Sequence, residues 1–399
     1  MNNFVWVGSR QSDINYTKGF FNSSVTLYGD NLHRNYALCK ISNRRIDNNT
    51  SGELRDKFVL EYIQKISNED YNSRFMFYDS AWVMEIKELE QFKKCFICLN
   101  DFELLDTVRN KIRFKKFVSE QGCFNLVNSC VVDSADLSVE TFQNLFDKFG
   151  EPLIFQKEVT SGGSGTFLVT KNNTELLAKL AVDKNRYIVS EYVWSNVPLN
   201  VHLAVFSNEI IVFPASVQLI ELENNCLLYK GGDYFAFNKL SNEHKKELYS
   251  CANKLGKILQ QSGFRGICGI DALLDENGKL FLMEVNPRFQ GSSNILDRAL
   301  SDYGYDSLVK INYDSFLHKG TEYTNIDLDN FSVDYSCYSL TYNDFGKQFL
   351  KEGRLLSKFG CIECENDGLD VEQQIDEQVY LLKLIFNKSI FKKGVAALF

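Results

Sequence analysis

The stretch that decides the fold is GICGIDALLDENGKLFLMEVNPRFQGSS, residues 266–293. Two apolar runs flank the dipeptide Asn277-Gly278, and this dipeptide is typical of a tight turn between antiparallel strands. The sequence therefore predicts a β-hairpin with strands at 267–275 and 279–286.

The polar side chains of this hairpin converge on one face. Glu284 and Asn286 are two residues apart on the second strand, so their side chains point the same way. The turn brings Asp271 of the first strand opposite them. Two carboxylates and an amide oxygen are ligands that Mg²⁺ accepts when nucleotide phosphates complete its shell. The intervening residues of the second strand are apolar and are expected to face a core: Phe281, Met283 and Val285.

An Asp followed, after twelve residues, by E-x-N-P-R resembles the metal-binding end of the ATP-grasp superfamily. The resemblance implies that Glu284 bridges two Mg²⁺ ions, with Mn²⁺ as an alternative metal, and that Asp271 and Asn286 each bind one ion. It also implies a catalytic Arg288 that contacts the transferred phosphate, a role that suits the planar guanidinium fork.

A second motif is LIFQKEVTSGGSGTFLV, residues 153–169, in which a glycine-rich turn joins two strands. It is not a Walker A sequence. By itself it is an ordinary hairpin turn; placed upstream of the metal hairpin, it resembles the loop that closes over ATP in ATP-grasp enzymes. There Lys157 would hold the α- and β-phosphates, and the loop residues would surround the nucleotide: Ser161, Gly162, Gly163, Ser164 and Gly165.

Two further segments resemble ATP-grasp sequences at the corresponding positions of the chain. The segment 106–122 is predicted to be one basic helix ending at Gly122, and Lys111 in it resembles a phosphate-binding lysine; Lys115 and Lys116 are interpreted as a solvated face. The strand 186–193 resembles the hinge that reads adenine through three residues: Glu191, Tyr192 and Val193. The chain departs from the family where an acidic ribose ligand is usual, because Val197, Pro198 and Leu199 stand there; Asn200 is the substitute candidate.

Two more side chains have alternative interpretations. Lys230, in LLYKGGDYF, is a candidate catalytic residue near the γ-phosphate or the substrate, or else an ordinary strand residue. His202 lies in an alternating strand and either faces the site or is a structural histidine.

The predicted fold class is α/β with ATP-grasp architecture. Strands at 4–8, 75–79 and 94–100 alternate with helices, which predicts a Rossmann-like parallel sheet without the dinucleotide fingerprint. The expected domains are an amino-terminal domain, two ATP-grasp lobes and a small carboxy-terminal α/β cap, at residues 1–105, 106–190, 191–310 and 311–399.

The composition and the start of the chain limit the classes of ligand and the cellular compartments that are expected. The 399-residue chain has a formal net charge of −8, which argues against a general nucleic-acid binder. The start does not resemble a signal peptide, and no apolar run is long enough to span a membrane, so a cytoplasmic location is expected. Eleven cysteines fit a reducing compartment, and the pairs Cys95/Cys98 and Cys361/Cys364 are interpreted as free thiols.

The resemblance implies an ADP-forming ligase that activates a small carboxylate, such as an amino acid, as an acyl phosphate and joins it to an amine. Two alternatives stay open: a thiol acceptor, such as an acyl or peptidyl carrier protein, and a catalytically silent nucleotide-binding module. A basic patch including Arg109 and Arg113 is the candidate docking surface for a carrier. The substrate pair and the oligomeric state have no readable motif.

Overall fold

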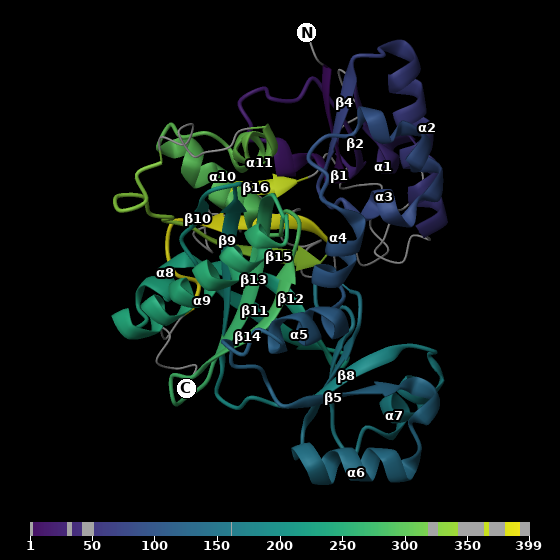
Figure 1. Ribbon diagram of the computed structural model, residues 1–399, viewed down its shortest axis with the longest axis vertical. Helices are drawn as coiled ribbons and strands as arrows, with labels where there is room; N and C mark the ends of the chain where they lie inside the picture. The colour runs from purple at the N-terminus through teal and green to yellow at the C-terminus, as the bar shows by residue number, and fades with distance from the viewer. Residues whose placement is uncertain are drawn as a thin grey trace, which may run out of the picture.

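The computed structural model describes residues 3–29, 34–41, 52–160, 162–317, 326–341, 363–366 and 380–391. Within these residues the fold is mixed α/β, with one small parallel sheet and one large antiparallel sheet. Figure 1 shows the small sheet, a central body around the large sheet, and a lobe that carries α6 (Val139–Phe149) and α7 (Thr174–Val182) apart from the small sheet.

The amino-terminal sheet is parallel, as the alternation of strands and helices predicts. Its order is β3-β2-β1-β4, and Val5 of β1 pairs with Ser23 on one side and with Phe75 on the other. The strands are β1 (Asn3–Arg10), β2 (Ser23–Tyr28), β3 (Asn35–Ala37) and β4 (Ser73–Phe77). The helical elements are η1 (Gln11–Ile14), α1 (Leu38–Ile41), α2 (Gly52–Glu69), α3 (Ala81–Glu85) and η2 (Lys87–Cys95).

The predicted strand at 94–100 is wrong. A 3₁₀ helix, η2, ends at Cys95, and only Phe96 forms an isolated bridge, with Phe75. The ring of Phe96 packs edge-on against Phe75 and Phe77. The apolar character of this segment therefore comes from side-chain burial rather than from a strand ladder.

The large sheet contains the predicted hairpin at one end. β13 (Gly266–Leu274) lies between β14 (Leu280–Asn286) and β9 (Val197–Val205). The predicted turn at 207–209 is confirmed, since Ile210 of β10 (Ile210–Val212) pairs with Val205. The sheet continues through β11 (Ser216–Glu223) and β12 (Cys226–Asp233), and α8 (Tyr234–Asn238) and α9 (Asn242–Gln261) follow. Leu248 and Leu255 of α9 share a core with Ile270 of β13.

The lobe with α6 and α7 has a core of its own, which includes Phe146, Phe155 and Tyr187. Its strands follow the order β7-β6-β8-β5. They are β5 (Ser129–Asp133), β6 (Leu153–Lys157), β7 (Thr166–Val169) and β8 (Arg186–Glu191); η3 (Ser134–Asp136) follows β5.

The basic segment 106–122 is two helices rather than the one predicted: α4 (Phe102–Arg109) and α5 (Lys111–Ser119). Asn110 between them is extended, with ψ near 114°, and its side-chain oxygen accepts hydrogen bonds from the backbone N–H groups of Ile112 and Arg113. Asn110 is thus an N-cap in the middle of a helical pattern. The break places Lys111 at the first position of α5.

The described part of the carboxy-terminal region adds strands to the large sheet. After α10 (Ser293–Asp302) and α11 (Leu308–Leu317), β15 (Ser336–Thr341) pairs with β12. β17 (Tyr380–Phe386) then lies between β15 and β16 (Glu363–Asn366). Cys361 of the second cysteine pair lies outside the described residues. Among the helices described, none is long and apolar enough to cross a bilayer.

Candidate active site

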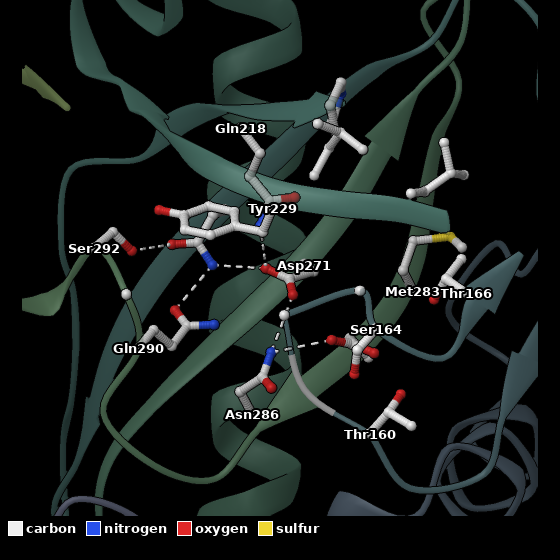
Figure 2. A pocket seen from close by; sticks show the side chains of 18 of the residues that line it. Thr160, Ser164, Thr166, Gln218, Tyr229, Asp271, Met283, Asn286, Gln290 and Ser292 are labelled. Atoms are coloured by element: carbon white, nitrogen blue, oxygen red, sulfur yellow. Dashed lines mark hydrogen bonds between the residues drawn. The ribbon is translucent and has the colours of Figure 1, made fainter. Parts of the chain in front are cut away.

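The hairpin of β13 and β14 brings the three predicted metal ligands together. Asp271 pairs directly with Glu284 in the strand register. The amide nitrogen of Asn286 donates to Asp271 Oδ2 at 3.0 Å and to Glu284 Oε1 at 3.3 Å. Figure 2 shows Asn286 and Asp271 pointing toward each other across the hairpin.

A β-bulge changes one expectation for this hairpin. Asp271 pairs with Glu284, but the next residue, Ala272, pairs with Leu282, so Met283 is the extra residue of β14. Phe281 and Val285 are buried as expected. Met283, expected to face a core, instead lines the same cavity as Glu284. The bulge was not visible in the sequence because residues 280–283 are all apolar, so the pattern does not show which of them changes face.

The two carboxylates have opposite electrostatic environments. Burial, and next the charge of Glu284, raises the pKa of Asp271 to about 7. Burial alone would also raise the pKa of Glu284, but the charge of Lys111 and hydrogen bonds hold it below its ordinary value. Lys111 Nζ lies 3.0 Å from Glu284 Oε2. Of the two carboxyl groups, Asp271 is therefore the one that takes up a proton more readily.

Lys111 and Arg288 place positive charge on either side of these carboxylates. Lys111 is buried, and its Nζ also donates to the backbone oxygen of Thr160, in the segment that leads into the glycine-rich loop. Arg288 donates to Asn286 Oδ1 at 3.1 Å and lies 3.4 Å from Asp79 Oδ2. Both side chains line the cavity that the carboxylates face.

This cavity has a volume of about 1080 Å³ and extends from the lobe with α6 and α7 to the amino-terminal sheet. Most of the predicted site residues line it: Lys111, Gly162, Gly163, Ser164, Glu191, Tyr192, Val193, Asn200, Asp271, Glu284, Asn286 and Arg288. Gly165 lies at the end of the loop, where its backbone oxygen accepts from Lys157 N. Ser161 lies outside the described residues.

The glycine-rich loop packs against β12. Gly163 has a φ of +82°, and a side chain there would place its Cβ 1.9 Å from the backbone oxygen of Leu227. The backbone oxygen of Gly162 accepts a hydrogen bond from Tyr229 N at 3.2 Å. Glycine at 163 is therefore required both by conformation and by the close approach of another strand.

The structure contradicts the expected position of Lys157. On β6, Ile154 and Gln156 line the cavity, whereas Leu153 and Phe155 belong to the core of the lobe. Lys157 follows this alternation to the far face, where its Nζ lies 3.0 Å from Asp183 Oδ2. Gln156 is the residue of β6 that faces the cavity at this level, and no motif in the sequence marks it.

The structure also contradicts the catalytic position expected for Lys230. Gly231 pairs with Leu219 and Tyr229 pairs with Ile220, so Lys230 is the extra residue of a bulge. Its side chain is buried and lies 2.6 Å from Glu223 Oε1. Tyr229, not Lys230, lines the cavity.

Asn200, the candidate for the ribose, lines the cavity next to Asp271 of the hairpin. It is buried, and its amide nitrogen donates to Asp271 Oδ1 at 2.7 Å and to Gln290 Oε1 at 2.9 Å. Gln218 donates to the same Asp271 oxygen at 3.0 Å, and Ser292 donates to Asn200 Oδ1 (Figure 2). Sequence reasoning missed this network because strand pairing alone assembles it from distant segments.

His202 is a structural histidine. It is fully buried away from the cavity, and its Nε2 lies 2.9 Å from Ser293 Oγ. Burial lowers the pKa of His202 to about 3, so the ring is neutral. Its role is to connect β9 to the start of α10.

Comparison with known proteins identifies one domain of the chain. The model of the ATP-grasp domain family matches residues 127–292. These residues form an ATP-grasp domain. The match begins just before β5 and ends just before α10, so it spans both the lobe with α6 and α7 and the metal hairpin. No curated protein sequence is significantly similar to the chain.

Solved structures share the fold over nearly the whole chain. An N5-carboxyaminoimidazole ribonucleotide synthetase bound to ADP superposes with a TM-score of 0.65 at 14% identity, covering 100% of this chain and 94% of that one. The Aspergillus clavatus N5-carboxyaminoimidazole synthase, with ADP and 5-aminoimidazole ribonucleotide, gives 0.65 at 11% identity, covering 100% and 98%. The biotin carboxylase domain of Hydrogenobacter thermophilus 2-oxoglutarate carboxylase gives 0.66 at 14%, covering 97% and 86%. At such identities the likeness establishes the fold.

The donor set of this ATP-grasp domain fits Mg²⁺. Asp271 and Glu284 supply carboxylate oxygens on one cavity wall. Asn286 faces them with its amide nitrogen, and its oxygen accepts from Arg288, so a turn of the amide would be needed for that oxygen to join the set. The described residues contain no cluster of three or more His, Cys, Asp and Glu side chains suited to a metal. The set is therefore too sparse for a closed, all-protein site and suits an ion whose remaining ligands are phosphate oxygens and water.

The predicted basic patch on α4 and α5 is open only in part, at Arg113 and Lys116, which are exposed. Lys115 donates to the backbone oxygen of Val127 at 2.6 Å, and burial lowers its pKa to about 8. Arg109 pairs with Glu85, and Arg113 pairs with Asp106. With Lys111 inside the cavity, few of these charges are left to dock an acidic partner, and Lys115 does not belong to a solvated face.

Proposed function

We propose that this protein is an ADP-forming, magnesium-dependent ligase that activates a small carboxylate as an acyl phosphate and transfers the acyl group to an amine. The observation that carries the proposal is the convergence of Asp271, Glu284 and Asn286 on a cavity that Lys111 and Arg288 also face. An ATP-grasp domain supplies the nucleotide-binding framework for this arrangement.

The chain's own residues would hold ATP along the cavity. The hinge residues Glu191–Val193 lie at one end with the apolar side chains of Ile154 and Met283, which suits a purine ring. The glycine-rich loop covers the middle. Lys111 and Gln156 then face the phosphates, and the bound Mg²⁺ would neutralise the charge of the β- and γ-phosphates at the hairpin.

Arg288 stands where the substrate carboxylate would meet the γ-phosphate. The carboxylate oxygen attacks phosphorus, the bond to the bridging oxygen of ADP breaks, and an acyl phosphate forms. The guanidinium is held by Asn286 and Asp79 and can bind the transferred phosphoryl group through paired hydrogen bonds. Most of the rate in such a step comes from positioning and electrostatics, so no protein nucleophile is required.

The second step joins the acyl group to the acceptor. An amine nitrogen attacks the acyl carbon, phosphate leaves, and the nitrogen loses a proton. One feature supports an amine over a carrier-bound thiol: Lys111 and Lys115 of α5 are engaged inside the protein, and Arg109 pairs with Glu85, which leaves few basic residues to dock an acidic carrier. Among the proteins of similar fold, one is bound to ADP and 5-aminoimidazole ribonucleotide, and another to MgADP and bicarbonate.

The test is to identify the nucleotide product. The protein is incubated with ATP, MgCl₂, a panel of carboxylic acids and hydroxylamine, and the nucleotides are separated by chromatography. ADP with a hydroxamate is the expected result. AMP and pyrophosphate would contradict the proposal, because adenylation breaks a different phosphate bond. A phosphopantetheinylated carrier offered together with amines decides the acceptor: an amide supports the proposal, and a thioester alone contradicts it.

A further inference from the structure

At the end of the cavity nearest the amino-terminal sheet, one carboxylate is incompletely bonded. Asp13 lies in η1, directly after the carboxyl end of β1, and lines the cavity. The residue is only 9% exposed. Its Oδ1 accepts a hydrogen bond from Arg10 Nη2 at 3.0 Å, but Oδ2 is buried and has no hydrogen-bond partner among the described residues.

A buried carboxylate oxygen without a donor costs free energy, so a site that retains one calls for a ligand that completes it. The ion pair with Arg10 fixes only one oxygen. The terminal torsion of an Asp side chain is broad, and a modest rotation presents Oδ2 to the cavity. The best donor for it is a cation, because a charge-assisted hydrogen bond is stronger than a neutral one.

Asp13 belongs to the same end of the cavity as Arg288. Tyr78 lies between them: its ring is under the guanidinium of Arg288, 5.9 Å from ring centroid to Cζ, and Tyr78 and Asp13 line the same cavity. The backbone of Tyr78 is held by hydrogen bonds to Val7 O and from Phe289 N, and its ring packs against the rings of Trp6 and Phe289. Arg288, a cation that can bind a carboxylate, and Asp13, a carboxylate with one unbonded oxygen, therefore flank the packed aromatic side chain of Tyr78.

We infer that the carboxylate substrate is an amino acid, whose ammonium group Asp13 binds while its carboxylate lies beside Arg288. This inference rests on the proposed function and specifies its substrate class. A zwitterion matches the two opposite charges, whereas a simple carboxylic acid of the same shape leaves Asp13 Oδ2 unbonded. Asp13 is thus assigned as a substrate-binding, specificity-determining residue.

The experiment compares common amino acids with their deaminated counterparts. Each compound is offered with ATP, MgCl₂ and hydroxylamine, and binding to the protein with MgADP is measured separately by calorimetry. We expect at least one amino acid to form a hydroxamate and to bind about tenfold or more tightly than its deaminated acid, as for one charged hydrogen bond. Equal affinities of such a pair, or activation of only ammonium-free acids, would overturn the inference.

Variants at position 13 provide a second readout. Asp13→Asn keeps an acceptor for Arg10 and should weaken binding of the amino acid about tenfold without changing its affinity for MgADP. Asp147→Asn, which alters an exposed carboxylate on α6, is the matched control. Unchanged amino-acid affinity in a folded Asp13→Asn protein would contradict the assignment; if the variant does not fold, the wild-type comparison still decides. Failure of the proposed ligase function would give a different result from failure of this inference, because ADP and hydroxamate would then be absent with every acid.

Discussion

The side chain on which the proposed chemistry depends most is Glu284. It touches Lys111 at 3.0 Å, and Asn286 donates to it. Glu284→Gln keeps the shape but removes the charge that a bridging metal ligand supplies. We expect ADP release to fall about a hundredfold or more, because metal-based charge neutralisation contributes several kcal/mol to the transition state. The assay is steady-state ADP release, with circular dichroism to verify the fold. Near-normal turnover of the folded variant would show that Glu284 does not belong to the active site.

The orientation of β6 gives a prediction that separates two neighbouring residues. Gln156 faces the cavity, whereas Lys157 pairs with Asp183 on the other face. We expect Gln156→Ala to weaken nucleotide affinity more than Lys157→Ala does. Lys157→Ala should cost at most about 1 kcal/mol of stability, since it loses a partly exposed ion pair. Calorimetric titration with MgADP compares the two variants. A larger loss of MgADP affinity for Lys157→Ala would show that Lys157, and not Gln156, is on the face of β6 toward the cavity.

At the same scale, the sequence predicted the hairpin of β13 and β14 and the convergence of its polar side chains well, and the positions of the lysines poorly. Asp271, Glu284 and Asn286 are placed by a local turn and by strand alternation, which can be read directly. Lys157 and Lys230 were chosen for their charge and motif position. Which face they occupy depends on the phase of β6 relative to a core and on a bulge in β12, and neither is encoded locally.

Among the elements, the glycine-rich loop offers a matched pair of substitutions. Gly162 and Gly163 both have positive φ, but only Gly163 approaches another strand closely. Gly162→Ala should cost about 1 kcal/mol through backbone strain alone. Gly163→Ala should cost more and raise the Kd for MgADP, because the loop must move off Leu227 of β12. Denaturant unfolding and nucleotide titration measure both effects; equal effects would mean that the loop does not dock there.

The break between α4 and α5 shows why element boundaries are harder to predict than element types. The helical pattern continues through Asn110, and no Pro or Gly near it marks a break. Asn110 ends α4 because its side chain caps α5 and also donates to Glu158 Oε2 of a distant segment at 3.1 Å. The local cap and the tertiary partner together decide the boundary.

On the scale of the whole molecule, the cavity is lined by segments that lie far apart in the chain, and their meeting cannot be predicted from the sequence. The parallel amino-terminal sheet was predicted from its alternation, and the large sheet from its turns. The approach of η1 to α10 and to the loop after β14 depends on packing between domains: Trp6 of β1 stacks edge-on against Phe289. For this reason Asp13, which lines the cavity opposite the metal hairpin, had no signal in the sequence.

This packing also makes a global prediction about pH. Asp297 on α10 is buried, and burial raises its pKa to about 7, with a smaller contribution from the charge of Asp13. Since an unfolded Asp ionises near pH 4, the folded protein holds more protons than the unfolded chain between about pH 4 and pH 7. Stability should therefore fall as the pH rises through that window, by at most about 1.4 kcal/mol per pH unit for this group.

The measurement is the free energy of unfolding by denaturant at several pH values between 5 and 8. Asp297→Asn retains an oxygen that can accept from the backbone N–H of Leu308, as Asp297 does, but it cannot ionise. We expect its stability to vary less with pH than that of the wild type. Asp271, whose pKa burial also raises to about 7, leaves a residual slope of the same sign in both proteins. If both slopes are equal, Asp297 is not the buried acid responsible for this pH dependence.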